Sequence, residues 1–242
     1  MLSKNTIFFD LDGTLLPLDI DMFLKYYFNV LTKKFLDLSS PEELTHILMS
    51  SVQDMIKNDG KRTNKEVFLK SFFNKIDVKD NDIIMDRFDD FYQNSFPKLD
   101  YLVEDKNCSK ELISLLKDKG YMLVLATNPL FPAIAIEKRI EWAGIKVDDF
   151  DFITTYENMH YTKPNLNYYQ EILDKIEKKA QECVMVGNNP GEDIVAKKLG
   201  IKTFLITDFL IDKHDVDFCP DWIGSLKEFK EYVELSVAEE IR

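Results

Sequence analysis

The sequence has few cysteines, a deficit of basic charge and no long apolar run, and each shortage excludes a class of protein. Its 242 residues include three cysteines, which lie far apart at Cys108, Cys183 and Cys219. An odd number of distant cysteines supplies neither a disulfide framework nor a CxxC metal site, so we expect all three to be reduced. Cys183 lies within an apolar run, which favours core packing over a reactive thiol.

Acidic residues outnumber basic ones, with 43 Asp and Glu against 31 Lys and Arg, and the formal net charge is −12. Because non-specific binding to nucleic acid or to an anionic membrane depends on basic patches, we expect neither partner. Positions 1–12 lack the basic start and apolar stretch of a signal peptide. No later run approaches the ~18 apolar residues that cross a bilayer. These features predict a cytoplasmic protein with small-molecule partners.

Short β-prone runs alternate with helix-period segments over most of the chain. The expected strands are 6–9, 121–126, 150–155, 183–186 and 203–206. The expected helices between them are 109–119, 133–143, 168–178 and 193–199, and a glycine follows three of these. Helix, glycine and strand in succession are typical of αβ units, so we predict an α/β fold with a Rossmann-like parallel sheet. A last helix over 226–234 could pack on the core or form a dimer contact, which leaves monomer and homodimer both open.

The segment 17–97 interrupts this alternation because it contains no convincing strand. Its periodicity predicts four amphipathic helices, at 19–36, 41–57, 64–75 and 80–96. Its many aromatic residues are at helical spacing, which favours a bundle core, although a minority could line a face over the active site. We therefore predict two domains, an α/β core formed by 1–16 and 99–242 and an all-helical insertion formed by 17–98.

Two carboxylates stand two residues apart directly after the first predicted strand. Positions 10–15 read DLDGTL, so Asp10 and Asp12 lie at the carboxyl end of that strand, where open α/β sheets bind ligands. This hexapeptide resembles the first motif of the haloacid dehalogenase-like (HAD) superfamily, most of whose members are phosphatases. The resemblance covers nearly the whole chain. It implies a HAD-like core in which the helical insertion is a four-helix cap over the substrate.

Three further motifs of that family follow in order. By resemblance, Thr127 and the backbone amide of Asn128 would bind the phosphoryl oxygens after the second strand. Lys163, in the run TKPN, would neutralise the nucleophile and the transferring group. The fourth motif is the run VGNNPGED at 186–193, where Asp193 matches the second acid of the family. Asn188 stands where the family usually has aspartate.

The resemblance implies a Mg²⁺-dependent phosphatase that hydrolyses a small-molecule phosphate monoester through an aspartyl-phosphate. The predicted catalytic residues are Asp10 as nucleophile, Asp12 as general acid and base, and Lys163. The predicted metal ligands are the Asp10 side chain, the Asp12 backbone carbonyl and Asn188, with Asp193 acting through water and keeping Lys163 in place. Such oxygen ligands suit a hard cation.

Two other functions stay open at this stage. One is a phosphoglucomutase-type isomerase, which uses the same motifs. The other is a catalytically impaired protein that binds a phosphoester or a metal, because Asn188 removes one negative charge from the metal site. Asp12 argues against the dehalogenase branch, which lacks this acid. The substrate is not predicted beyond sugar phosphates, nucleoside monophosphates or related metabolites, and His160, three residues before Lys163, is assigned no role.

Overall fold

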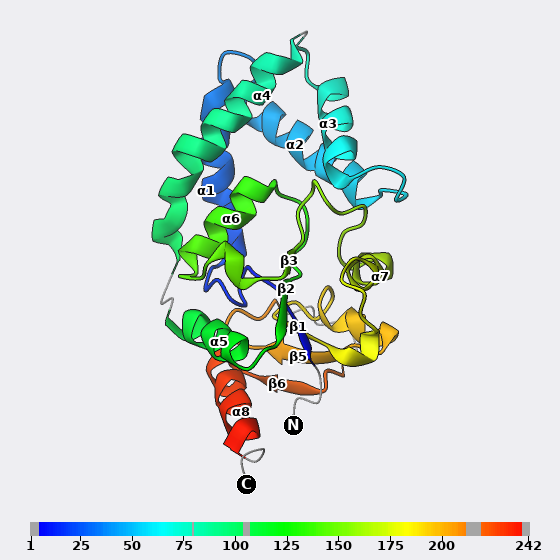
Figure 1. Ribbon diagram of the computed structural model, residues 1–242. Helices are drawn as coiled ribbons and strands as arrows, with labels where there is room; N and C mark the ends of the chain where they lie inside the picture. The colour runs from blue at the N-terminus through cyan, green and yellow to red at the C-terminus, as the bar shows by residue number, and fades with distance from the viewer. Residues whose placement is uncertain (1–4, 79, 104–106, 212–218, 239–242) are drawn as a thin grey trace.

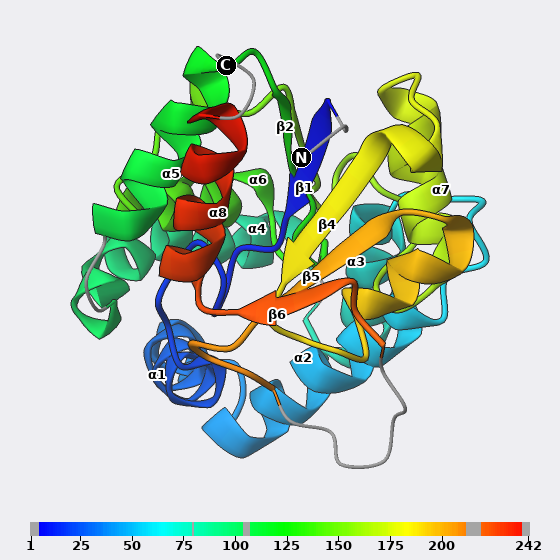
Figure 2. The same ribbon diagram turned by 90° about the horizontal axis from the view of Figure 1, so that it is seen from below.

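A computed structural model describes residues 5–78, 80–103, 107–211 and 219–238. The two predicted domains, 1–16 with 99–242 and 17–98, also include positions that lie outside the described residues. Six parallel strands form one sheet: β1 (Thr6–Phe9), β2 (Met122–Leu125), β3 (Phe152–Ile153), β4 (Cys183–Gly187), β5 (Lys202–Ile206) and β6 (Trp222–Gly224). Their order is β3-β2-β1-β4-β5-β6, and Figure 2 shows the part from β2 to β6. The predicted α/β, Rossmann-like fold is confirmed. The order changes direction between β1 and β4, the place where such sheets bind ligands at their carboxyl ends.

Helices cover both faces of the sheet. Successive side chains of a strand point to opposite faces, and those of β1 are apolar on both, so each face needs a covering layer. Phe8 of β1 packs on one face, beneath α7 (Leu166–Lys175). Its neighbours Ile7 and Phe9 join the apolar cluster on the other face, with α5 (Asn107–Asp118) and α8 (Leu226–Ala238) (Figure 2). All three β1 side chains are fully buried, so the strand that leads to the first motif lies at the centre of the core.

Four helices follow β1 and lie beyond the carboxyl ends of the strands (Figure 1). They are α1 (Ile20–Thr32), α2 (Pro41–Ile56), α3 (Asn64–Lys75) and α4 (Asn81–Asp90). Each begins after a residue whose side-chain oxygen accepts a first-turn N–H, and these residues are Asp19, Ser40, Thr63 and Asp80. No helix in the described ranges is both long and apolar enough to cross a membrane.

Aromatic packing joins this helical block to the core. Phe23 of α1 contacts Phe96 edge to face, and Phe96 stacks on Trp142 at a ring separation of 5.0 Å. Trp142 ends α6 (Ala133–Trp142), which follows β2. The buried side chains of the block and of one sheet face therefore form one continuous apolar cluster.

Backbone hydrogen bonds also join α3 to the loop after β3. The N–H of Asn64 donates to Met159 O at 2.8 Å, and the N–H of Lys65 donates to Tyr156 O at 2.7 Å. The Asn64 side chain, which is fully buried, donates from Nδ2 to Tyr161 O at 3.1 Å. The first N–H groups of a helix have no partner within it, so these loop carbonyls satisfy donors that would otherwise be left unpaired.

Several element boundaries differ from those predicted. The helix predicted over 80–96 ends at Asp90 and continues as a π turn (Phe91–Ser95) and a 3₁₀ helix (Phe96–Leu102), because Pro97 cannot lie inside an α-helix. The segment 193–199 forms a 3₁₀ helix (Ile194–Leu199), and α1 ends in another (Lys33–Phe35). Two more short 3₁₀ helices, Val147–Asp149 and Ala180–Glu182, precede β3 and β4. β3 has two residues instead of six, and β6 was not predicted.

Candidate active site

Polar side chains gather where β1, β2 and β4 end. Asp10 directly follows β1, Thr127 comes shortly after β2, and Asn188 directly follows β4. The strands stay in register up to this edge, because the N–H of Asp10 donates to Val186 O at 2.9 Å and the N–H of Ala126 donates to Phe9 O at 2.8 Å. Three segments that are distant in the sequence therefore present their side chains at one place.

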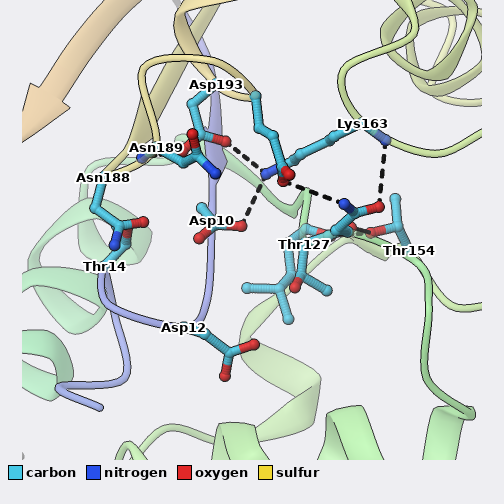
Figure 3. Close-up of polar contacts among 12 residues, drawn as sticks. Asp10, Asp12, Thr14, Thr127, Thr154, Lys163, Asn188, Asn189 and Asp193 are labelled. Carbon is cyan, nitrogen blue, oxygen red and sulfur yellow. Dashed lines mark hydrogen bonds and ion pairs between the residues drawn. The ribbon is translucent and has the colours of Figure 1, made fainter. Parts of the chain in front are cut away.

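Lys163 links two carboxylates at this edge (Figure 3). Its Nζ donates to Asp10 Oδ1 at 2.8 Å and to Asp193 Oδ1 at 2.6 Å. Burial disfavours the charged ammonium, but Asp10 and Asp193 outweigh it and raise the pKa of Lys163 well above its ordinary value. Burial raises the pKa of Asp193 to about 7, against the opposing effect of Lys163. The cluster has two acids and one base, so its charge is not fully balanced and a further cation would be favourable beside it.

Asp193 uses its second oxygen to hold the turn that follows β4. Its Oδ2 accepts the N–H of Asn189 at 2.9 Å, so both carboxylate oxygens already have partners. This approach requires Gly187, because a Cβ at that position would lie 2.2 Å from Asp193 Oδ2. Asp193 is therefore placed to fix Lys163 and the turn.

Asn188 lies beside the first motif. Its Oδ1 accepts the Thr14 hydroxyl at 3.3 Å, and its Nδ2 donates to the Phe209 carbonyl at 2.6 Å. Gly13, at φ +78°, makes room for it, because a Cβ there would lie 2.1 Å from Asn188 Nδ2. Only glycine meets both requirements at position 13.

Asp12 stands apart from the lysine cluster in Figure 3. It pairs with an arginine that was not predicted from the sequence. Arg139 of α6 is fully buried, and its Nη1 donates to Asp12 Oδ2 at 2.5 Å. Burial raises the pKa of Asp12 and Arg139 opposes this, while the neighbouring Asp10 raises it further. Among the described residues, no hydrogen-bond partner reaches the buried atoms Asp12 Oδ1 and Arg139 Nη2. The guanidinium also packs on the Phe131 ring at 4.4 Å.

Thr127 and Asn128 tie the second motif to the others. The Thr127 carbonyl accepts the hydroxyls of Thr154, at 2.7 Å, and Tyr168, at 2.8 Å. Asn128 Oδ1 accepts the N–H of Lys163 at 3.2 Å, and Asn128 Nδ2 donates to Glu192 Oε2 at 3.1 Å. The Asn128 side chain thus connects three motifs, whereas only its backbone amide was predicted to take part in the site.

A cavity of about 190 Å³ opens at this edge, and the predicted residues surround it. Those lining it are Asp10, Asp12, Thr127, Asn128 and Asn188. Lys163 and Asp193 are almost fully buried and are not part of the cavity lining. The helical block supplies Ile20 and Leu24 to the same cavity, and the loop after β2 supplies Leu130 and Phe131. His160, which had no assigned role, pairs through Nδ1 with Glu171 Oε1 at 2.7 Å.

The donor set fits a hard divalent cation, although it is poor in charge. The groups that face the cavity are carboxylate and amide oxygens, which such ions prefer. Within the described part of the chain, no group of three or more His, Cys, Asp or Glu side chains is arranged to hold a metal. At the adjoining ends of β1 and β4, the side chains that line the cavity are Asp10, Asn188 and Asn189, and Asn189 Oδ1 already accepts the N–H of Gly191.

Comparison with known proteins places the chain in a family. The family model described as haloacid dehalogenase-like hydrolase matches residues 7–206. The chain therefore belongs to the haloacid dehalogenase-like hydrolases and is an enzyme of that class, as the four motifs predicted.

Individual relatives are distant. The chain is 23% identical to pyrophosphatase PpaX of Bacillus cereus strain Q1, over 86% of this chain and 92% of the relative. Among solved structures, a HAD phosphatase from Thermococcus onnurineus matches with a TM-score of 0.57 and 20% identity, covering 95% of this chain and 97% of that one. A 2-haloacid dehalogenase from Pseudomonas syringae pv. Tomato DC3000 matches with a TM-score of 0.63 and 18% identity, covering 96% and 99%. At these identities the solved structures show the fold.

Proposed function

We propose that the protein hydrolyses small-molecule phosphate monoesters, with Asp10 as nucleophile and Asp12 as general acid and base. The observation that carries this proposal is the position of the Asp10 carboxylate. One of its oxygens is held by Lys163 at 2.8 Å, and the residue lines the cavity together with Asp12 and Thr127. A fixed carboxylate beside a second carboxylate is the arrangement that covalent catalysis by aspartate requires.

The reaction would proceed in two displacements. A carboxylate oxygen of Asp10 attacks phosphorus, the ester P–O bond breaks, and the leaving oxygen takes its proton from Asp12. Asp12 then accepts a proton from the water that attacks the aspartyl-phosphate, which releases inorganic phosphate and restores Asp10. Lys163, the Thr127 hydroxyl and the Asn128 backbone amide would stabilise the charge on the transferring phosphoryl group.

A magnesium ion would be held by the Asp10 side chain, the Asp12 backbone carbonyl and Asn188. When bound, the ion offsets the repulsion between the phosphate dianion and the attacking carboxylate. Asp193 would contribute through an ordered water, because both of its carboxylate oxygens already accept hydrogen bonds from protein groups.

Asp12 favours phosphoryl transfer over dehalogenation. An alkoxide leaving group needs a proton, whereas a halide leaves without one, so a second acid beside the nucleophile serves the first reaction. The names of PpaX and of the Thermococcus phosphatase support the same choice. We further propose that 17–98 act as a cap over the site, because Ile20 and Leu24 of α1 form part of the cavity wall.

The proposal is tested by phosphate release from p-nitrophenyl phosphate and acetyl phosphate, with magnesium and with EDTA. We expect magnesium-dependent release that falls by roughly 10³-fold or more in Asp10→Asn, because the nucleophile is lost. Asp118→Asn, at the exposed end of α5, makes the same chemical change away from the site and should retain activity.

Either remaining alternative would give a distinct result. Stimulation by a sugar bisphosphate, with phosphate retained in the product, would identify a mutase. Tight phosphoester binding without release from any substrate would identify a binding protein, which the amide at Asn188 favours.

A further inference from the structure

A second cavity, of about 290 Å³, adjoins the candidate active site. Helices α1, α2, α3 and α4 all contribute to its walls, and so do the loops after β2 and β3. Leu24, Leu130 and Phe131 line both this cavity and the one that contains Asp10. Leu130 and Phe131 belong to the same loop as Thr127. A group bonded to a phosphate beside Thr127 therefore has the larger cavity as its neighbour.

The walls of the larger cavity are mainly apolar and aromatic. The rings that face it include Tyr27, Phe28, Phe68, Phe88, Tyr92 and Tyr156. The hydroxyls of Tyr27 and Tyr92 hydrogen-bond to each other at 2.8 Å, and the Tyr27 ring packs edge to face on Phe131 at 5.5 Å. This shared bond uses one of the two hydroxyl donors, so the ring faces and at most one O–H are the surface available to a ligand.

The charged residues of this cavity do not provide a site for an anion. They are Lys65, Asp89 and Glu157, two acids and one base. Glu157 Oε2 accepts the N–H of Ala133, at the start of α6, at 3.0 Å. Lys65 Nζ lies 5.8 Å from the centre of the Tyr156 ring, a cation–π arrangement that occupies the one base. A second phosphate or a carboxylate on the substrate would meet no excess of positive charge.

We propose that this cavity binds the leaving group, and that the substrates are phosphate esters of alcohols or phenols with an apolar, ring-containing body. This inference rests on the proposed phosphatase function and specifies its substrate class. A cavity of about 150 Å³ holds benzene, so the volume of about 290 Å³ accommodates one or two fused rings. Pyrophosphate, named in the PpaX relatives, has a small anionic leaving group that uses none of these contacts.

The proposal is tested with three substrates that share the phosphate and differ in the group attached to it. They are 2-naphthyl phosphate, phosphoglycolate and acetyl phosphate, assayed with magnesium and the full chain. We expect kcat/KM for 2-naphthyl phosphate to exceed that for phosphoglycolate by about tenfold or more, since burial of apolar groups in a fitted pocket discriminates to this extent. Acetyl phosphate reports on the phosphoryl chemistry without filling the cavity.

A substitution inside the cavity separates this effect from general reactivity. Val52→Phe on α2 adds a ring to the cavity wall and should lower the ratio of kcat/KM for 2-naphthyl phosphate to that for acetyl phosphate by about tenfold. Ile83→Phe on α4 adds the same kind of bulk at an exposed position outside the cavity and should leave the ratio unchanged. 2-Naphthol, the product alcohol, should inhibit the wild type competitively, which needs no variant.

The outcomes separate the two proposals. A wild type that prefers phosphoglycolate to 2-naphthyl phosphate, or that 2-naphthol does not inhibit, overturns the cavity assignment while the phosphatase stands. Equal ratios in Val52→Phe and Ile83→Phe, both folded by thermal melting, also overturn it. Failure to hydrolyse even acetyl phosphate overturns the proposed function, and the fluorescence of 2-naphthol bound to the wild type then tests the cavity alone.

Discussion

Asn188 uses both ends of its side-chain amide, which an aspartate could not do. The Nδ2 group donates to the Phe209 carbonyl at 2.6 Å, and Oδ1 accepts from Thr14. An aspartate would keep the acceptor, lose the donor and place a charged oxygen against a carbonyl. The amide at this position therefore stabilises the loop after β5 and also lowers the charge of the proposed metal site.

These two effects predict opposite changes in Asn188→Asp. Magnesium binding should tighten by about tenfold, because affinity for a hard cation rises with ligand charge. The free energy of unfolding in EDTA should fall by about 1–3 kcal/mol, because the Phe209 carbonyl loses its donor. Isothermal titration with magnesium and urea unfolding in EDTA measure the two effects.

Asn189→Asp is the matched control, because it adds the same charge one position along the turn. Asn189 Oδ1 accepts the N–H of Gly191 at 3.1 Å, a bond that aspartate can keep. Equal tightening in both variants would show that position 188 is not a ligand and that charge alone draws the ion.

At this scale the sequence predicted the residues that belong to a contiguous motif and missed those that depend on tertiary pairing. Asp10, Asp12 and Lys163 were predicted because each lies in a recognisable run. Arg139 was missed because its partner Asp12 is 127 positions away. One signal was available, because Arg139 occupies the same helical face as Ala135 and Ile136 and is the charged residue on that apolar stripe.

The start of α3 is the element that most directly fixes the helical block to the core. Its first two N–H groups donate to loop carbonyls, and Asn64 adds a side-chain bond to Tyr161 O. Gly60, at φ +82°, precedes it, and a Cβ there would lie 2.1 Å from the Tyr161 hydroxyl. This junction is polar and directional, unlike the aromatic packing at α1.

We predict that Asn64→Ala lowers the free energy of unfolding by about 1 kcal/mol, because it removes the side-chain donor of the part-buried Tyr161 carbonyl. Amide hydrogen exchange at 64, 65 and 156–161 should become faster, because the junction opens locally before the rest unfolds. Asn74→Ala, an exposed position of the same helix, should alter neither quantity. Unchanged exchange in Asn64→Ala would contradict a role for this residue in joining the two parts.

The elements that were predicted poorly are short or disturbed by proline. β6 has three residues, one of them glycine, and therefore shows no periodicity that a sequence pattern could reveal. β3 was predicted too long because its β-prone run continues past the two residues that pair with β2. The bounds of the long helices α2 and α3 were predicted within one residue, because their capping residues Ser40 and Thr63 can be recognised in the sequence.

At the scale of the whole molecule, buried tyrosines make the free energy of unfolding fall as the pH becomes alkaline. Burial raises the pKa of Tyr27 to about 12, and that of Tyr92 well above its ordinary value, whereas unfolded tyrosine titrates near ~10. A raised folded-state pKa gives stability that is complete below ~10 and is lost as the pH rises further. The unfolding free energy should fall by about 1 kcal/mol for each of the two tyrosines between pH 9 and pH 11.

Urea unfolding at the two pH values measures this loss. The double variant Tyr27→Phe/Tyr92→Phe removes both titrating groups and both partners of their shared hydrogen bond, a replacement that is nearly neutral at pH 9. The variant should therefore lose less stability than the wild type on going to pH 11. Identical losses would contradict the assignment of this effect to the pair.

The overall topology was the most predictable level, because alternation of strand and helix permits few arrangements. The sequence predicted a Rossmann-like parallel sheet and a helical insertion after the first strand. It could not predict the two adjoining cavities, because their walls combine side chains from α1 to α4 with loops that lie about a hundred positions further along the chain.

The segment 156–163 takes part in the larger cavity, in the junction with α3 and in the candidate active site. Tyr156 and Glu157 face the larger cavity, the carbonyls of Tyr156, Met159 and Tyr161 hold α3, and Lys163 at its end holds Asp10. A hinge motion of the helical block must break bonds to the same short peptide that positions the lysine. Under the proposed cap role of 17–98, access for the substrate and the position of the nucleophile would be coupled, so we expect an open molecule to hold Asp10 less firmly for attack on phosphorus.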